Sequence, residues 1–405
     1  MRRYNKNNYS NKICQMEERM KNNQYKETLK KDDSFFFRIP KKLGSGSKKD
    51  VVHIMMTSKG LMENLQYIND GVFQIDGTYR LTKNNYPWIV CGIVDLRDVF
   101  HPIAFMISNQ ETVYEFSEFF SGLVDLATDL GYEFDPEYVM MDASDATYNA
   151  VKKIFKYSTI LMCYFHVMKN IKSNCQRPLP PMKYDELLED IRHIHMCKSD
   201  EYDSCIMKFK HKWDSKSTKK VYDYCSTWFT GRFCKWQIFH NPPGWANTNS
   251  NIESFNATIK RDFSLRKRYS VYASVNVVKE MILYYSTNPK TFHKTPKFDQ
   301  NVHNLGKRCA LDMSFKKTDK YTVTYKDKYK INTKCRVCNC RYFLKNAICS
   351  HILGYVYKTP KLDKELWFGS KYNNEPTDFN FNMKRGAKNK KIGRYKRSEK
   401  ALEAY

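Results

Sequence analysis

The distribution of apolar positions from residue 71 onward predicts three consecutive strands. Each run is rich in β-branched and aromatic residues, and short links with turn-forming residues separate the runs. They read GVFQIDGTYRLT (71–82), YPWIVCGIVDL (86–96) and VFHPIAFMIS (99–108). Because short links join antiparallel neighbours, we expect a meander.

A helical period follows the third run. Residues 112–131 place apolar side chains three and four positions apart, and Gly131 is a stop signal. A short apolar strand at 137–142, a helix at 144–155 and a second apolar strand at 158–165 come next. The order βββ-α-β-α-β predicts an α/β fold of the RNase H-like type, with a mixed sheet and helices on its faces.

The rest of the chain divides by changes in composition and periodicity. Residues 1–33 are polar and aperiodic, which predicts a disordered tail with at most a frayed helix over residues 15–31. We expect a helical lead-in over residues 34–70. Helical periodicity returns over about residues 182–240, as an α-helical insertion. A turn, NPPGWANTNSN, ends it, and a helix opens at IESFNATIKRDF.

Three acidic residues mark places where apolar segments end. Asp76 ends one strand, in FQIDGTY, and Asp142 ends another, in YVMMDAS. A carboxylate at the end of a buried strand is costly unless it is paired or bound to a cation. On neighbouring strands, the two could share Mg²⁺ or Mn²⁺, which prefer oxygen ligands. Glu253, one turn into the helix after ANTNSN, is the candidate third ligand.

A structural interpretation of the same acids is open. Asp76 could cap a turn, Asp142 could cap a helix, and Glu253 could be a solvated acid in a first turn. Asp145 competes with Asp142 because it lies nearer the helix start. We favour Asp142 as the site residue since it directly follows the apolar strand, and Asp145 as a capping residue.

The motifs IDGTY, MDAS, CYFH and TNSNIESFN occur in that order and resemble those of Mutator-like (MULE) transposases. The likeness covers roughly residues 35–290, and it implies an RNase H-like DDE transposase domain over 71–290. It also implies that Asp76, Asp142 and Glu253 form the DDE metal triad. One departure is Met141, where the family usually has serine before the second aspartate.

The family's Cys-x-x-His motif falls on Cys163 and His166. This spacing suits a metal, but two ligands do not make a zinc site. Core packing with a hydrogen-bonded imidazole is an equal alternative. We therefore expect His166 near the active site without a definite role.

A second group of potential ligands lies in CRVCNCRYFLKNAICSH, residues 335–351. Cys338, Cys340, Cys349 and His351 form the pattern C-x-C-x8-C-x-H, which could surround one tetrahedral Zn²⁺. Cys335 makes a competing C-x-x-C with Cys338, and we take it as spare.

The Cys/His pattern resembles the SWIM-type zinc finger, which often follows the catalytic domain in Mutator-like proteins. On this resemblance we expect a SWIM-type zinc finger over residues 320–358. With four protein ligands, the site would be closed and structural.

Charge and cysteine content narrow the class of protein. The excess of 69 Lys and Arg over 43 Asp and Glu gives a net charge of +26, and nine of the basic residues lie in a tail, 383–405. A polyanionic partner such as nucleic acid is therefore expected, the alternative being a solvated, Lys-rich surface. The resemblance to transposases implies that this partner is double-stranded DNA. Thirteen cysteines, an odd count, favour free thiols or metal binding in a reducing compartment over disulfides. No apolar run is long enough to predict membrane insertion.

Together these observations predict a Mutator-like DDE transposase that cleaves DNA with Mg²⁺ or Mn²⁺ and transfers the new 3′ end. We expect a nuclear protein that forms a homo-oligomer on DNA. Two alternatives stay open. One is a non-catalytic DNA-binding regulator domesticated from such an element, and the other is an RNase H-like nuclease that cuts without joining.

Overall fold

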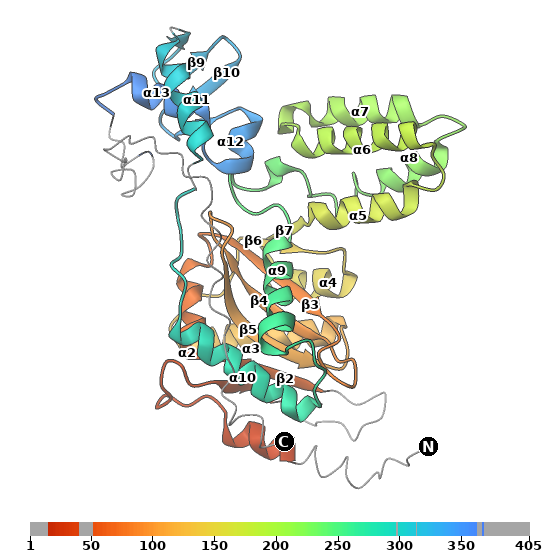
Figure 1. Cartoon of the computed structure of the whole chain (residues 1–405), viewed down its shortest axis with the longest axis vertical. Coiled ribbons are helices and arrows are strands. Elements are labelled where there is room, and N and C mark those ends of the chain that lie inside the picture. Colours follow the sequence, from red (N-terminus) through yellow and green to blue (C-terminus); the bar gives the residue numbers. More distant parts are fainter. Residues whose placement is uncertain (1–14, 40–51, 297–298, 313, 363–366, 368–405) are drawn as a thin grey trace, which may run out of the picture.

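The structure is a computed structural model that describes residues 15–39, 52–296, 299–312, 314–362 and 367. A mixed sheet of seven strands lies at its centre, in the order β1-β2-β5-β4-β3-β6-β7 (Figure 1). Its strands are β1 (Phe35–Arg38), β2 (His53–Thr57), β3 (Val72–Thr78), β4 (Trp88–Val94), β5 (Phe100–Ser108), β6 (Tyr138–Met141) and β7 (Thr159–Met162). The mixed α/β architecture expected from the sequence is confirmed.

Strand β3 lies between the antiparallel and the parallel halves of this sheet. It pairs antiparallel with β4 along its whole length, from Val72 opposite Val94 to Thr78 opposite Trp88. On its other edge it pairs parallel with β6, which pairs parallel with β7. The carboxyl ends of β3, β6 and β7 therefore lie at the same end of the sheet.

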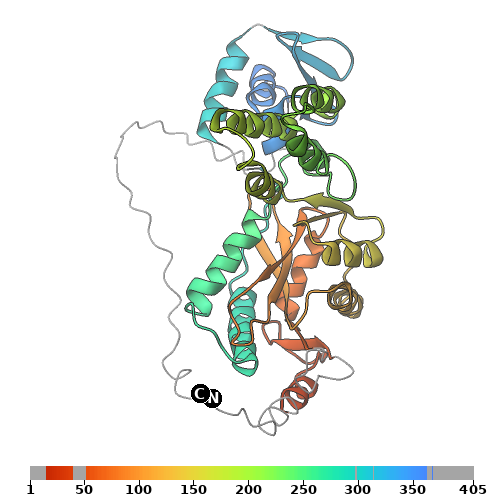
Figure 2. The same ribbon diagram turned by 90° about the vertical axis from the view of Figure 1, so that its right-hand side faces the viewer.

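Helices cover both faces of the sheet. Helices α3 (Val113–Asp129) and α4 (Asp145–Ile154) lie on one face, and α9 (Ser250–Thr258) and α10 (Val271–Thr287) lie on the other (Figure 2). The short helices α2 (Lys59–Met62) and η1 (Glu63–Tyr67) precede β3, and the π-helix η4 (Ile259–Phe263) continues α9. Both faces are thereby shielded from water.

The period of two along β3 decides which side chains meet which helices. Phe73 and Ile75 enter the apolar core with α3 and α4. Gln74 and Asp76 point to the opposite face, where Gln74 bonds to the start of α9 and Asp76 bonds to α9 itself. The alternation places a carboxylate beside the α9 helix.

The helical insertion (residues 181–240) and α5 form a separate apolar cluster that includes Ile191, Trp213 and Trp236. Its elements are α5 (Tyr164–Cys175), α6 (Pro181–Met196), η2 (Ser199–Glu201), α7 (Tyr202–Trp213), α8 (Lys219–Ser226) and η3 (Ile238–His240). The apolar positions face one another between the helices, which explains the helical period of this segment.

The C-terminal unit (residues 300–358) contains a four-stranded sheet in the order β11-β10-β9-β8. Its elements are α11 (Gln300–Leu311), β8 (Phe315–Lys317), β9 (Thr322–Tyr325), β10 (Tyr329–Asn332), β11 (Val337–Cys338), α12 (Arg341–Asn346) and α13 (Ser350–Lys358). Helix α11 packs on α13. The sequence predicted that this unit begins at residue 320. In the structure, α11 and β8, which precede residue 320, also belong to it.

The expected helical lead-in over residues 34–70 is wrong for its two strands. β1 and β2 extend the sheet beyond β5, with Met55 opposite Met106, and only α2 and η1 of this segment are helical. Strands of four or five residues are too short to show a period. β2 pairs with β5 and β1 pairs with β2, and no local pattern reveals this pairing.

The sequence allowed at most a frayed helix in the tail, and the structure differs in that this segment packs on the sheet domain. Residues 15–22 form a helix, and Met16 and Met20 are buried against the α9 and α10 side of the sheet. A polar segment can fold when it places a few apolar side chains on one face. Residues 1–14 and the basic tail, 383–405, lie outside the described residues. In the described part of the chain, every helix is too short or too polar to cross a bilayer.

Candidate active site and metal centre

Asp76 and Asp142 lie at the shared carboxyl-end edge of β3 and β6. Asp142 directly follows the last residue of β6. In the parallel register Gln74 is opposite Met140, so continuing by two residues brings Asp76 level with Asp142. Neighbouring strands are about 4.8 Å apart, so the two carboxylates share one end of the sheet.

Glu253 reaches the same place from the covering helix. It lies in the first turn of α9, which packs on β3 and β4. One turn further along the helix, Asn256 Nδ2 donates a hydrogen bond of 2.7 Å to Asp76 Oδ2. Because residues three apart share a helix face, Glu253 and Asn256 both face the end of β3.

The electrostatics of Asp76 reflect the approach of the other two acids. Burial raises the pKa of Asp76, and the charges of Asp142 and Glu253 raise it further, to about 7, against the opposing hydrogen bond from Asn256. The site therefore carries mutual repulsion that a cation would relieve.

His166 and Cys163 lie against the start of α9. The His166 Nε2 atom is 3.5 Å from Glu253 Oε1. The Cys163 sulfur accepts a hydrogen bond of 3.1 Å from the Asn249 amide. Burial raises the pKa of Cys163 to about 11, so its thiol stays protonated at neutral pH. Cys163 therefore acts in packing and hydrogen bonding, while His166 contacts a candidate site residue.

Glu111 and Tyr79 also belong to this region, and the sequence reasoning missed them. The Tyr79 hydroxyl donates a 2.7 Å hydrogen bond to Glu111 Oε2. The carboxylate lies over Gly77, where a Cβ would be only 2.7 Å from Glu111 Oε1. Burial raises the pKa of Glu111, and the charge of Asp142 adds to the increase.

The sequence held few signals for these additional residues. Asn256 could have been found, because it follows Glu253 at the helical spacing of three. Glu111 lies in the link between β5 and α3, where nothing in the pattern distinguishes it from a solvated loop acid.

Asp145 has a different role from the one expected. The helix cap of α4 is Ser144, whose hydroxyl accepts a hydrogen bond from the Thr147 amide. Asp145 is the first residue of the helix, is exposed, and pairs with Arg232 at 2.9 Å. A shorter hydroxyl side chain reaches the first-turn amide, so the capping prediction was wrong by one residue.

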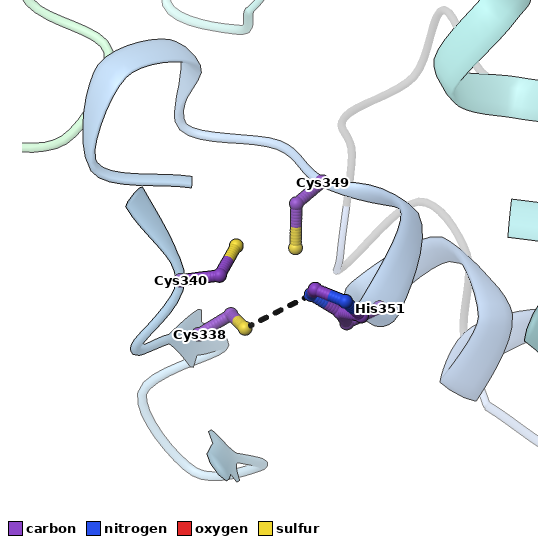
Figure 3. A group of neighbouring side chains, drawn as sticks. All are labelled: Cys338, Cys340, Cys349 and His351. Carbon is purple, nitrogen blue, oxygen red and sulfur yellow. Dashed lines mark hydrogen bonds between the residues drawn. The ribbon is translucent and has the colours of Figure 1, made fainter. Parts of the chain in front are cut away.

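Cys338, Cys340, Cys349 and His351 come together in the C-terminal unit (Figure 3). One candidate ligand atom from each residue lies within 4.8 Å of all the others. The Cys338 sulfur and His351 Nδ1 are 3.7 Å apart. In tetrahedral zinc sites, bonds of about 2.3 Å to sulfur and 2.0 Å to nitrogen place ligand atoms roughly 3.5–3.8 Å apart.

The surroundings of the cluster suit metal ligands. The sulfurs of Cys340 and Cys349 cap α12 and α13, accepting hydrogen bonds from the Phe343 and Ile352 amides at 3.3 and 3.5 Å. Burial raises the pKa of Cys349 well above its ordinary value, so a thiolate there requires a neighbouring cation. The cluster could therefore bind zinc.

Cys335 is exposed and lies outside this group. In the part of the chain that the structure describes, the Cys/His cluster is where three or more potential metal ligands come within 4.8 Å of one another. Asp76, Asp142 and Glu253 interact electrostatically but do not form so tight a group.

Residues 72–170 match the family model of the MULE transposase domain. The resemblance inferred from the motifs is thereby confirmed over these residues, which include Asp76, Asp142, Cys163 and His166. The matched span ends before Glu253. A comparison with curated proteins found no match.

Proposed function

We propose that the chain is a DDE transposase that cleaves DNA strands with divalent metal ions and joins the new 3′ end to target DNA. The observation that carries this proposal is the approach of Glu253, on α9, to Asp76 and Asp142 at the end of two parallel strands. The MULE match over residues 72–170 supports the same function.

The strand order supports an RNase H-like fold for the catalytic domain. Strands β5, β4 and β3 form an antiparallel meander, and β6 and β7 add parallel strands next to β3. This is the βββ-α-β-α-β arrangement predicted from the sequence. In this proposal β1 and β2 extend the sheet, and the helical insertion lies between α5 and α9.

The proposed roles follow from position. Asp76, Asp142 and Glu253 would hold Mg²⁺ or Mn²⁺, which require oxygen ligands. When bound, such ions activate the attacking oxygen and stabilise the leaving oxygen at phosphorus. Asn256 holds the Asp76 carboxylate in place through its 2.7 Å hydrogen bond. His166, at 3.5 Å from Glu253 Oε1, limits where the Glu253 carboxylate can lie.

We further propose that Cys338, Cys340, Cys349 and His351 bind one zinc ion in a SWIM-type zinc finger. Four protein ligands leave no open position for a reaction, so the role of zinc would be structural. Because the C-terminal unit is small, metal binding would supply much of its folding free energy.

The partner in this proposal is double-stranded DNA, both at the element ends and at the target. The net charge of +26 supports association with a polyanion. A DNA substrate implies a nuclear protein, and joining two ends to one target implies a homo-oligomer on DNA.

Strand cleavage tests the proposal. The substrate is a duplex with the genomic sequence that flanks the coding region, incubated with the purified chain and Mg²⁺ or Mn²⁺. We expect cleavage and joining by the native chain, and loss of both in Asp76→Asn, Asp142→Asn and Glu253→Gln with DNA binding retained. Asp145→Asn is the matched control and should cleave normally.

The outcomes separate the proposed activity from its rivals. Binding without cleavage by the native chain would favour a domesticated DNA-binding regulator. Cleavage without joining would indicate a nuclease. Full cleavage by any one of the three variants would remove that residue from the mechanism.

A further inference from the structure

The segment that connects the helical insertion to α9 contacts the C-terminal unit. This connection, residues 241–249, passes beside α12, as Figure 1 shows. The Gly244 amide donates a 3.1 Å hydrogen bond to the Leu344 carbonyl. A Cβ at Gly244 would lie 2.5 Å from the Ala347 Cβ, so the two backbones touch at a residue that must lack a side chain.

Gly244 also has a backbone conformation that favours glycine. Its φ angle is +81°, in the left-handed region. Ala347, on the other side of the contact, ends α12 with a φ angle of +56°. The contact therefore joins two turns of defined shape.

Helix α12 lies between candidate metal ligands. Cys340 caps its first turn, and Cys349 follows two residues after Ala347. A cation bound by these sulfurs would fix both ends of α12, and hence the surface that Gly244 contacts.

A second contact joins the C-terminal unit to the helical insertion. Arg341, the first residue of α12, pairs with Glu201 of η2 at 3.0 Å. Both side chains are partly exposed, so the pair contributes modestly to stability. Its main effect is on orientation, because it holds α12 at a second point.

Beyond Gly244, the connection is tied to the candidate active site. The Thr248 carbonyl accepts a 2.9 Å hydrogen bond from Gln74 Nε2, on the same strand as Asp76. The Asn249 amide donates to the Cys163 sulfur. Glu253 follows one turn later, in the first turn of α9.

We propose that the C-terminal unit positions Glu253, with α12 contacting the connection 241–249 at Gly244 and being oriented by the pair of Arg341 with Glu201 on the helical insertion. This inference rests on the proposed function, because it assigns the metal-binding unit a role at the same active site. Metal binding by Cys340 and Cys349 holds α12, α12 holds the connection, and the connection sets where α9 begins. Gly244 and Arg341 are positioning residues, and they do not touch the reacting groups.

Gly244→Ala in the full-length, zinc-loaded chain tests this directly, with Gly231→Ala as the matched control. Gly231 has nearly the same φ angle, +79°, but an added Cβ would meet nothing within 4 Å. Both variants carry the same backbone cost, and only Gly244→Ala disturbs α12. Amide hydrogen exchange over residues 245–256 is the readout.

We expect exchange over 245–256 to accelerate at least ten-fold in Gly244→Ala and to be unchanged in Gly231→Ala, with one zinc per chain in both. Removing zinc from the native chain should produce the same acceleration. Unchanged exchange in either Gly244→Ala or the zinc-free chain would overturn the inference.

Charge reversal provides a second, independent variant in case Gly244→Ala does not fold. Arg341→Glu alone should accelerate exchange over 245–256, and adding Glu201→Arg should restore the native rate. Acceleration that the second substitution does not reverse would contradict a role for this pair.

The exchange readout does not depend on cleavage. If exchange responds as expected but the native chain does not cleave DNA, the positioning holds and the proposed function fails. If the native chain cleaves DNA and Gly244→Ala changes neither exchange nor cleavage, the positioning fails and the proposed function holds.

Discussion

Asp76→Asn should stabilise the protein while it removes the proposed activity. Burial and the charges of Asp142 and Glu253 raise the pKa of Asp76 from 3.8 to about 7. Ionised Asp76 therefore destabilises the folded state above that pH. The asparagine keeps the shape of the side chain, and its Oδ1 can still accept the hydrogen bond from Asn256.

The magnitude follows from the pKa difference. At about 1.4 kcal/mol for each pKa unit, the difference between 3.8 and about 7 corresponds to an upper limit of about 4 kcal/mol. Asp76 is only partly buried, so solvent screening reduces this to about 2 kcal/mol. For a domain of this size, such a change raises the melting temperature by roughly 4 to 8 °C.

The sign of the pH dependence is specific. Because the folded pKa is raised, the folded state binds the proton more tightly than the unfolded state. Stability is then lost as pH rises from about 4 to about 7, and the loss is complete above that range. The stabilisation by Asp76→Asn should therefore be largest at pH 8 and less than half as large at pH 5.

Thermal melting of zinc-loaded protein without added Mg²⁺ or Mn²⁺ measures this effect. Asp145→Asn is the control, since Asp145 is exposed and pairs with Arg232 across the surface, and it should change the melting temperature by less than about 2 °C. Added Mg²⁺ should raise the melting temperature of the native chain more than that of Asp76→Asn. A variant no more stable than the native chain at pH 8, or equally stabilised at pH 5, would refute the reasoning.

Three further predictions concern other parts of the chain. Cys340→Ser and His351→Ala should each lose the single zinc ion that metal analysis counts, and the C-terminal unit should unfold. Circular dichroism should show that the sheet domain stays folded, and retained zinc would exclude this ligand set. Glu111→Gln should weaken Mn²⁺ binding, measured by calorimetry, about ten-fold, because Glu111 adds negative charge near Asp142. Tyr79→Phe should weaken it less, because Tyr79 only orients the Glu111 carboxylate. Unchanged Mn²⁺ affinity in Glu111→Gln would show that Glu111 does not act on the metals. Deleting residues 383–405 should reduce the slope of log affinity for duplex DNA against log salt by several units, at about 0.9 per phosphate contact, and an unchanged slope would show that the tail does not contact DNA.

Strands β3 to β7 of the central sheet and the two aspartates were predictable because the local pattern and the tertiary environment agree. Asp142 directly follows the apolar strand β6, and Asp76 lies near the carboxyl end of β3, which continues to Thr78. The end of a buried strand is the part that stays accessible for such a group. The Cys/His cluster was also predictable from the local sequence, because four ligands within a short segment can converge in few geometries.

Other features depend on contacts between distant segments. Gln74 carries no sequence signal, yet it ties β3 to the start of α9 through two hydrogen bonds. Glu111 reaches the site because Gly77 leaves room for its carboxylate. Strand β2 forms by pairing with β5, and β1 forms by pairing with β2. No local period records these long-range contacts, so sequence reasoning could not find them.

Crystals of the chain soaked in Mn²⁺ would test the central claim most directly, with anomalous diffraction measured at the manganese edge. Our account predicts manganese peaks at bonding distance from carboxylate oxygens of Asp76, Asp142 and Glu253. The zinc signal at Cys338, Cys340, Cys349 and His351 would serve as an internal reference. Manganese bound elsewhere, or none at these three carboxylates at saturating concentration, would contradict the account.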